Sequence, residues 1–85
     1  MPRISEFYGI VIEMYWNEHN PPHFHAIYSD DEAQVSIHTG EVLRGDLPAR
    51  AARLVKDWSE IHRAELEQNW DLARSNRALL KIAPL

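Results

Sequence analysis

Residues 7–17 read FYGIVIEMYWN, and the alternation in this segment indicates the fold class. Every second residue is apolar throughout, and these residues are Tyr8, Ile10, Ile12, Met14 and Trp16. The residues between them are mixed in polarity and include Glu13 and Asn17. A period of two with one apolar side is typical of a strand that lays one face on a core. We therefore predict a strand over residues 7–17.

Short strands separated by turns continue the β pattern to residue 45. Turn-forming residues gather at 18–22, where two prolines cannot donate to a ladder, and at the acidic segment 29–32. The predicted strands between and after these turns span residues 23–29, 33–38 and 41–45. Thr39–Gly40 suits a two-residue hairpin loop, because glycine accepts a positive φ.

The spacing becomes helical after Pro48. Asp46 suits the N-cap position, and proline is tolerated in the first turn of a helix. Apolar residues then recur at helical spacing and shift register once: Ala51, Leu54, Val55, Trp58, Ile61, and then Leu66, Trp70 and Ala73. The shift predicts a bend or a second helix that begins near residues 62–64, and Ser75 with Asn76 ends the helical segment.

These elements predict one α+β domain over residues 1–85. Its β half is 1–47, its α half is 48–76, and an apolar tail covers 77–85. We expect a small antiparallel sheet of three to four strands, covered on one face by a C-terminal helical layer. This layer is either one long bent helix or a helical hairpin, and the other face of the sheet stays partly open. The tail should dock on the body or on a partner.

The composition of the 85 residues narrows the classes of protein. The chain has no cysteine, which excludes a disulfide framework and thiolate metal sites and agrees with a reducing compartment. No signal-like or membrane-spanning segment is apparent, so we expect a cytoplasmic protein without membrane contact. The net charge of −4 argues against a wholly basic nucleic-acid binder but allows a local basic patch.

Most of the candidate chemistry lies in HNPPHFHA, residues 19–26, which contains three of the five histidines. Alternate side chains of a strand share a face, so His23 and His25 should point the same way. The diproline before them would hold the entry to the strand and position His23. If the helices cover the apolar side, the open face collects polar residues: Glu13, Tyr15, His23, His25, Gln34, Ser36 and His38.

One interpretation of the histidines is a metal site. Zinc takes imidazole ligands, and an open site needs three protein ligands. The candidate ligands are His19, His23 and His25, and His38 or Glu13 are further sources of the third ligand. No motif in the sequence requires a cofactor, so a divalent metal such as zinc is an alternative prediction.

A second interpretation is acid–base catalysis on RNA without a metal. One imidazole accepts a proton and the other donates one, which makes His23 and His25 the candidate catalytic pair. Arg44, Arg50 and Arg53 lie near the start of the helical segment and are candidate phosphate contacts. The purely structural interpretation is an exposed histidine pair on a sheet and a helix face on which arginines pair with acidic neighbours.

Three segments of the chain together resemble a known bacterial family. They are Ile4–Ile10, the Pro-Pro-His-Phe-His-Ala block at 21–26, and Trp58–Trp70 with the Leu-Ala-Arg that follows at 72–74. Over essentially its whole length the chain is similar to the family described as domain of unknown function four-one-six-zero (DUF4160). The most specific block is His-x-Pro-Pro-His-Phe-His-Ala, with Asn20 at the variable position.

The resemblance implies a partner and an activity. Members are often encoded beside a second small domain, in pairs classed as toxin–antitoxin-like modules in which this family has the toxin role. We therefore expect a small antitoxin-like partner encoded nearby and a toxin-like function, with RNA as the candidate substrate. The motif positions that carry over are His19, Pro21, Pro22, His23 and His25.

Two other classes of function stay open. One is a non-catalytic protein-binding or transcriptional regulatory module, which would use the open sheet face and the apolar tail as interaction surfaces. The other is a metal-binding accessory domain. The tail would also be the contact of a homo-oligomer.

Overall fold

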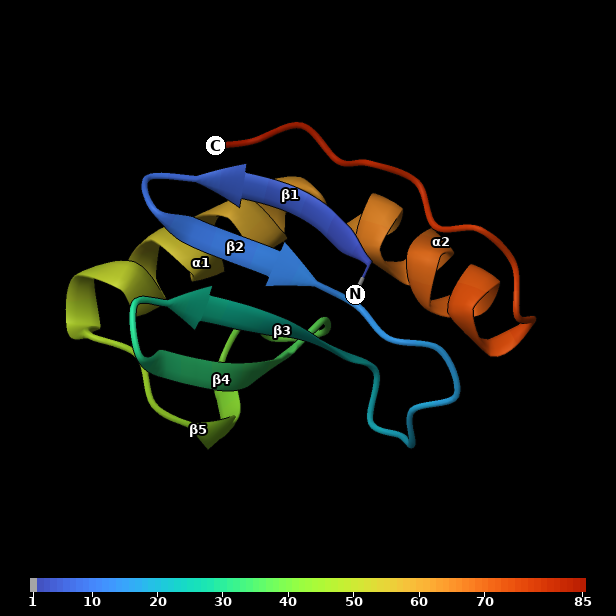
Figure 1. Ribbon diagram of the computed structural model, residues 1–85, viewed down its shortest axis with the longest axis horizontal. Coiled ribbons are helices and arrows are strands. Elements are labelled where there is room, and N and C mark those ends of the chain that lie inside the picture. Colours follow the sequence, from blue (N-terminus) through green and yellow to red (C-terminus); the bar gives the residue numbers. More distant parts are fainter. Residues whose placement is uncertain (1) are drawn as a thin grey trace.

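The computed structural model describes residues 2–85, which form five strands followed by two helices (Figure 1). The strands are β1 (Arg3–Phe7), β2 (Ile10–Glu13), β3 (His23–Tyr28), β4 (Asp31–Ser36) and β5 (Val42–Gly45). They form one antiparallel sheet in the order β1-β2-β3-β4-β5, so each strand pairs with its neighbours in the sequence. The α+β class is confirmed, with one strand more than the three to four predicted.

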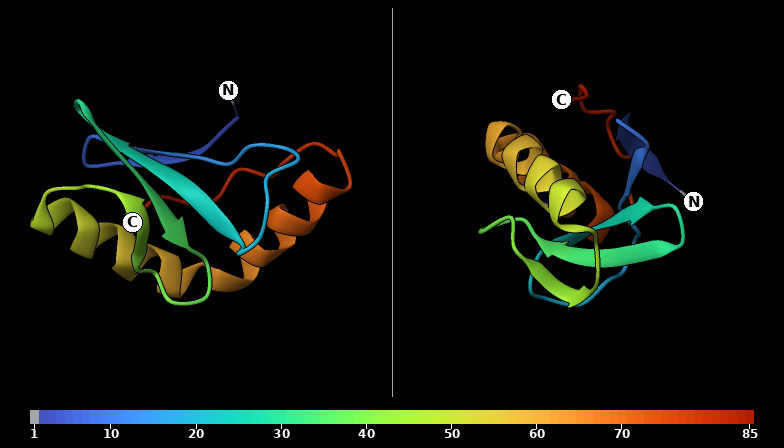
Figure 2. Two further views of the ribbon diagram at one scale, coloured as in Figure 1. Left: turned by 90° about the horizontal axis from the view of Figure 1, so that it is seen from below. Right: turned by 90° about the vertical axis from the view of Figure 1, so that its left-hand side faces the viewer.

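The helices α1 (Ala49–Ile61) and α2 (Arg63–Arg74) cover one face of the sheet, nearly end to end (Figure 2). His62 alone separates them, so the helical layer is one long bent rod rather than a hairpin. The break predicted near residues 62–64 is confirmed. Asp46 does not cap α1, because Pro48 occupies the N-cap and no side chain bonds there. Within residues 2–85, neither helix has the length and apolar character needed to cross a membrane.

The core lies between the sheet and this helical layer. Trp58 of α1 is fully buried, and its ring lies 5.3 Å from that of Phe7 and 5.7 Å from that of Phe24. Burying each large apolar side chain stabilises the fold by roughly 1.5–3 kcal/mol. Trp58 and Trp70 are core residues as predicted. Ile61, which the spacing places in the core, is 67% exposed because α1 ends there and the rod bends.

The predicted strand over residues 7–17 is wrong in its extent. Tyr8 and Gly9 form the turn of the β1–β2 hairpin, with φ of 51° and 78°. Two successive positive φ values are typical of a two-residue hairpin turn. Tyr8 is 64% exposed, but it stands two residues before Ile10 and is also apolar. The apolar alternation therefore continues through the turn, and the sequence pattern does not reveal it. This hidden turn accounts for the extra strand.

The β3–β4 and β4–β5 connections also differ from the prediction. β4 begins at Asp31, so the predicted turn at 29–32 is shorter. At the other end of β4, the Ser36 N–H donates to the Glu41 carbonyl at 2.9 Å, so residues 37–40 form a longer loop than the predicted Thr39–Gly40 turn. Gly40 lies against α1 with φ of +74°, and a Cβ there would stand 2.8 Å from Ser59 Oγ. The loop thus packs closely on the helix.

The apolar tail docks on the body of its own chain (Figure 1). The Ile82 N–H donates to the Ile4 carbonyl of β1 at 2.8 Å. On the helical side, the buried Asn69 amide of α2 donates to the Leu80 carbonyl and accepts from the Leu80 N–H, both at 2.9 Å. The tail therefore bridges the first strand and the second helix.

Candidate metal centre

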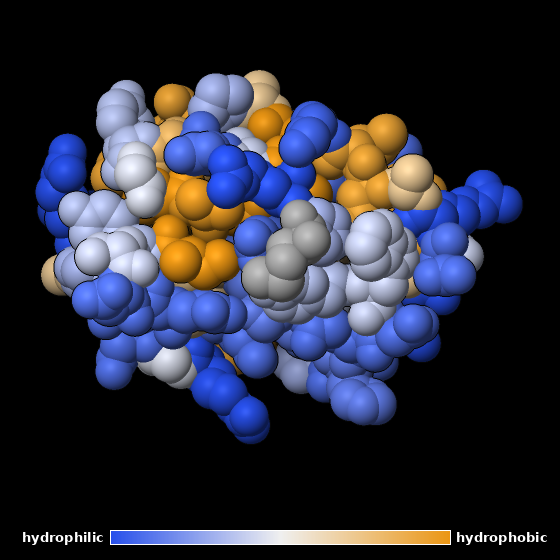
Figure 3. Space-filling view, viewed as in Figure 1, coloured by the Kyte–Doolittle hydropathy of each residue, from blue (hydrophilic) through white to orange (hydrophobic). Residues whose placement is uncertain are grey.

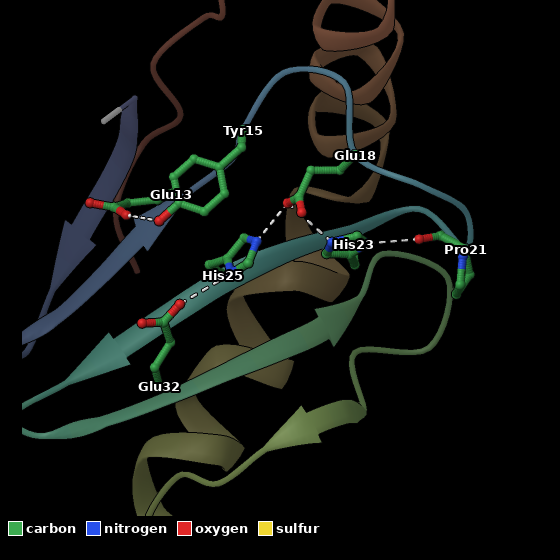
Figure 4. Close-up of polar contacts among 7 residues, drawn as sticks. All are labelled: Glu13, Tyr15, Glu18, Pro21, His23, His25 and Glu32. Carbon is green, nitrogen blue, oxygen red and sulfur yellow. Dashed lines mark hydrogen bonds and ion pairs between the residues drawn. The ribbon is translucent and has the colours of Figure 1, made fainter.

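The connection between β2 and β3 folds back over the polar face of β3 (Figure 4). This loop contains the cis Asn20–Pro21 bond and brings Tyr15 and Glu18 over the histidines. The Tyr15 ring centroid lies 4.4 Å from that of His25. As a result His23 and His25 are only 6% and 5% exposed. The predicted open, exposed histidine face is wrong, because this loop covers the part that the helices leave free.

The Glu18 carboxylate joins the two imidazoles. Its Oε1 atom lies 2.6 Å from Nε2 of His25 and 3.2 Å from Nε2 of His23. The ligand atoms of these three residues all lie within 4.8 Å of one another. A tetrahedral zinc ion with bonds of about 2.1 Å separates its ligand atoms by about 3.4 Å. The three side chains are therefore close enough to hold one metal ion.

The other nitrogen of each imidazole points to an acceptor of its own. His23 Nδ1 lies 2.8 Å from the Pro21 carbonyl oxygen, and His25 Nδ1 lies 3.2 Å from Glu32 Oε2. Carbonyl oxygens and ionised carboxylates only accept hydrogen bonds, so both Nδ1 atoms donate. Both Nε2 atoms then face the Glu18 oxygen. Metal-ligating histidines typically have this arrangement, in which the free N–H donates to a carbonyl or carboxylate.

Aromatic side chains flank both imidazoles. The Trp70 ring of α2 lies 5.3 Å from that of His23. On the other side, the Tyr15 hydroxyl donates to Glu13 Oε1 at 2.7 Å. Burial raises the pKa of the Tyr15 phenol, and the hydrogen bond to Glu13 raises it further. Tyr15 therefore keeps its proton and donates it in a hydrogen bond to Glu13, which is not one of the three grouped residues.

A cavity of about 370 Å³ lies beside this group. Its lining comprises Glu18, His19, Asn20, Pro21, His23, Gln34, Leu43 and Arg44. The cavity thus reaches the site from the side of β4 and β5. Figure 3, which has the viewpoint of Figure 1, shows a mostly hydrophilic surface over the half of the molecule where β4 and β5 lie. A polar ligand can therefore reach His23 from this side.

The remaining predicted ligands lie apart from the group. His19 lines the cavity but is exposed, and within residues 2–85 it does not join the cluster of ligand atoms. His38 lies in the β4–β5 loop, exposed, with its Nδ1 3.9 Å from a carboxylate oxygen of Glu67 on α2. The structure thus brings together two of the three predicted metal ligands and puts Glu18 in the third place.

The three arginines predicted to contact phosphate are separated from one another. Arg44 on β5 lines the cavity together with His23. Arg50 instead borders a small cavity of about 60 Å³ next to Tyr8. Arg53 is exposed on α1. Of the three arginines, only Arg44 lines the same cavity as His23.

Sequence reasoning missed Glu18 and Glu32, which it assigns to turns without a role. The signal that exists is spacing, since Glu18 precedes His23 by five residues and His25 by seven. That spacing becomes a contact only because the loop doubles back over β3. No periodicity in the sequence encodes this return.

Comparison with known proteins agrees with the resemblance noted in the sequence. The family model described as Domain of unknown function (DUF4160) matches residues 9–71, a range that includes Glu18, both buried histidines and Arg44. No curated protein and no solved structure matches the chain. Since the family model covers well over half of the sequence, the chain belongs to the DUF4160 family.

Proposed function

We propose that this protein binds a divalent transition-metal ion, with zinc as the reference ion, through Glu18, His23 and His25. The observation that carries the proposal is that both Nε2 atoms face one Glu18 oxygen while both Nδ1 atoms donate elsewhere. Because both Nδ1 atoms donate, an Nε2 atom can bond a Glu18 carboxylate oxygen only if its ring carries a second hydrogen. One metal ion satisfies all three ligand atoms at once.

The ligand types and their surroundings support a zinc-like ion. Imidazole nitrogen combined with carboxylate oxygen suits zinc and its neighbours in the first transition row. Both imidazoles are nearly buried and are oriented by Pro21 and Glu32, so little ordering remains to be done on binding. Three protein ligands beside a cavity make an open site, the kind that keeps a fourth position for water or a ligand.

Calorimetric titration of zinc into metal-free protein tests the proposal. The protein must carry no histidine tag and must first be stripped with a chelator. We expect one zinc ion per chain, and a d–d spectrum typical of low coordination when cobalt replaces zinc. The His25→Gln and Glu18→Ala variants should lose this binding, while far-ultraviolet circular dichroism shows that they remain folded.

The matched control is His38→Gln, because His38 is an exposed histidine outside the three-residue group. It should bind zinc as the wild type does. The proposal is overturned if folded wild type binds no zinc, or if His25→Gln and His38→Gln weaken binding equally.

As a second candidate, we propose that the protein is the toxin-like component of a two-gene module and acts on RNA. Family membership supports this role through the resemblance, and the position of His23 at a cavity wall supports contact with a ligand. With a net charge of −4, RNA binding would need local or partner-supplied positive charge. The partner would be a small antitoxin-like protein in the cytoplasm of the same cell. A homo-oligomer through the tail would use outward-facing residues such as Leu80.

Growth of a bacterial host on induction tests the toxin role. We expect arrest by the wild type, relief when the neighbouring gene is co-expressed, and no arrest by the double variant His23→Ala/His25→Ala. The His38→Ala variant is the control and should still arrest growth. Normal growth at confirmed soluble expression of the wild type would contradict the role in that host.

A further inference from the structure

We infer that the cavity beside His23 binds a phosphate group, held between the metal ion and the Arg44 guanidinium. The inference rests on the proposed metal binding and names the class of ligand that this site takes. It follows from the position of the cavity, from an Arg44 guanidinium that no carboxylate neutralises, and from the charges around the three ligands.

The cavity is next to the open side of the metal site. Glu18 and His23 form part of its wall, whereas His25 does not. An ion held by three protein ligands keeps a fourth position. Because the Trp70 and His25 rings both pack against His23, a fourth ligand would approach the ion from the cavity. A ligand in the cavity can therefore reach the metal directly.

Arg44 supplies a second anchor in the same cavity. Gln34 of β4 pairs with His25 of β3 on one side and with Arg44 of β5 on the other. The side chains of these three residues therefore lie in one row across the same face of the sheet. None of the ion pairs among residues 2–85 involves Arg44, so its charge is not neutralised by a carboxylate. A guanidinium presents paired donors that match the oxygens of phosphate.

The surrounding charges make this binding dependent on the metal. Glu18, Glu13 and Glu32 all lie close to the histidines, and their carboxylates repel an anion while the site is empty. A divalent ion offsets two of these three negative charges and offers a phosphate oxygen a direct ligand bond. The volume of about 370 Å³ is at the low end for small-ligand sites, and Leu43 and Pro21 provide apolar contact for an organic group. A phosphate monoester such as a mononucleotide fits these properties.

The test measures phosphate binding to the full chain in its metal-loaded and metal-free forms. The protein is loaded with one equivalent of zinc, freed of excess ion, and titrated with inorganic phosphate and then with uridine monophosphate in a calorimeter. A parallel sample carries cobalt, so that phosphorus-31 resonances of a ligand at the metal broaden and shift. We expect binding to the loaded protein only, with paramagnetic broadening.

Arg44→Gln is the decisive variant, and Arg53→Gln is its matched control because Arg53 is an exposed arginine outside the cavity. Loss of a charge-assisted contact should weaken phosphate binding by roughly tenfold or more in Arg44→Gln. Zinc affinity should stay unchanged in both variants, which shows that the metal centre is intact. Arg53→Gln should bind phosphate as the wild type does.

The outcomes separate this inference from the metal proposal. If zinc binds stoichiometrically but phosphate does not bind, or binds Arg44→Gln and wild type equally, the phosphate inference is overturned and the metal site stands. If zinc does not bind at all, both are overturned at the first step. Binding with cobalt broadening that Arg44→Gln weakens and Arg53→Gln preserves would support it.

Discussion

The two faces of β3 are almost equally buried, but one is stabilised by apolar packing and the other by polar contacts. Phe24 and Ala26 point to the helices and have no exposed surface. His23 and His25, between and beside them, point to the loop and are nearly as buried. Apolar side chains are stabilised simply by removal from water, whereas each buried polar atom needs a partner. Similar burial on one strand therefore indicates a structural face and a chemical face.

The two faces also differ in whether residues of the chain alone supply their contacts. On the helix-facing side, the packing partners all come from the chain itself. The loop-facing side has ring nitrogens and one shared carboxylate oxygen whose contacts require bridging hydrogens or a cation. The free energy of unfolding should therefore respond to metal through the loop-facing side alone.

The largest effect is expected from Phe24→Ala on the apolar face. Removing a fully buried phenyl ring leaves a cavity and should lower the free energy of unfolding by about 3–5 kcal/mol. Urea denaturation followed by tryptophan fluorescence measures it. The fraction that remains folded should still bind one zinc ion, and a loss below about 1 kcal/mol would mean that this face is not the core of the fold.

Zinc should stabilise the wild type and not the His25→Ala variant. At a free zinc concentration about 100 times the dissociation constant, binding to the native state alone adds about 2.7 kcal/mol. Denaturation with and without zinc measures the increment. An equal increment in His25→Ala would place zinc somewhere other than the loop-facing side.

Glu32→Gln should weaken zinc binding without abolishing it. Glu32 accepts the Nδ1–H of His25 and so orients a ligand rather than binding the ion. Loss of such a partner typically costs 10–100-fold in metal affinity, and we expect about tenfold because the Glu32 side chain is 53% exposed. Calorimetry measures the affinity; an unchanged value would mean that His25 is oriented by packing alone.

Tyr15→Phe should have the smallest effect and should change the response to alkaline pH. Loss of the hydrogen bond to Glu13 costs about 1 kcal/mol. Because burial raises the pKa of the Tyr15 phenol in the folded state, its contribution is complete below the unfolded pKa of about 10 and is lost as pH rises above it. Denaturation at rising pH should show a steeper loss in the wild type than in Tyr15→Phe, and parallel curves would contradict this.

Much of the fold could be predicted because it depends on local periodicity. The strand at β3, the break in the helical layer and the core position of Trp58 follow from spacing in the sequence. Ends of elements were harder to predict. The Tyr8–Gly9 turn falls in phase with the flanking alternation, and Ile61 continues a helical pattern beyond the point where it has a partner.

The candidate site was predictable only in part. Alternation along a strand determines that His23 and His25 share a face, and it needs no knowledge of the rest of the chain. Whether that face is exposed depends on the course of the β2–β3 loop. A loop leaves no periodic pattern in the sequence from which its course could be predicted. Glu18 and Arg44 come from a turn and an edge strand, and their approach to His23 depends on the loop's return and on strand order.

The sequence by itself determined the fold class, the paired histidines and the family. The tertiary structure alone decided that these histidines are covered, that Glu18 is their common partner, and that Arg44 shares the adjacent cavity. The physical reason is that backbone geometry imposes periods of two and 3.6 residues on neighbouring side chains, whereas contacts between distant segments result from packing the whole chain.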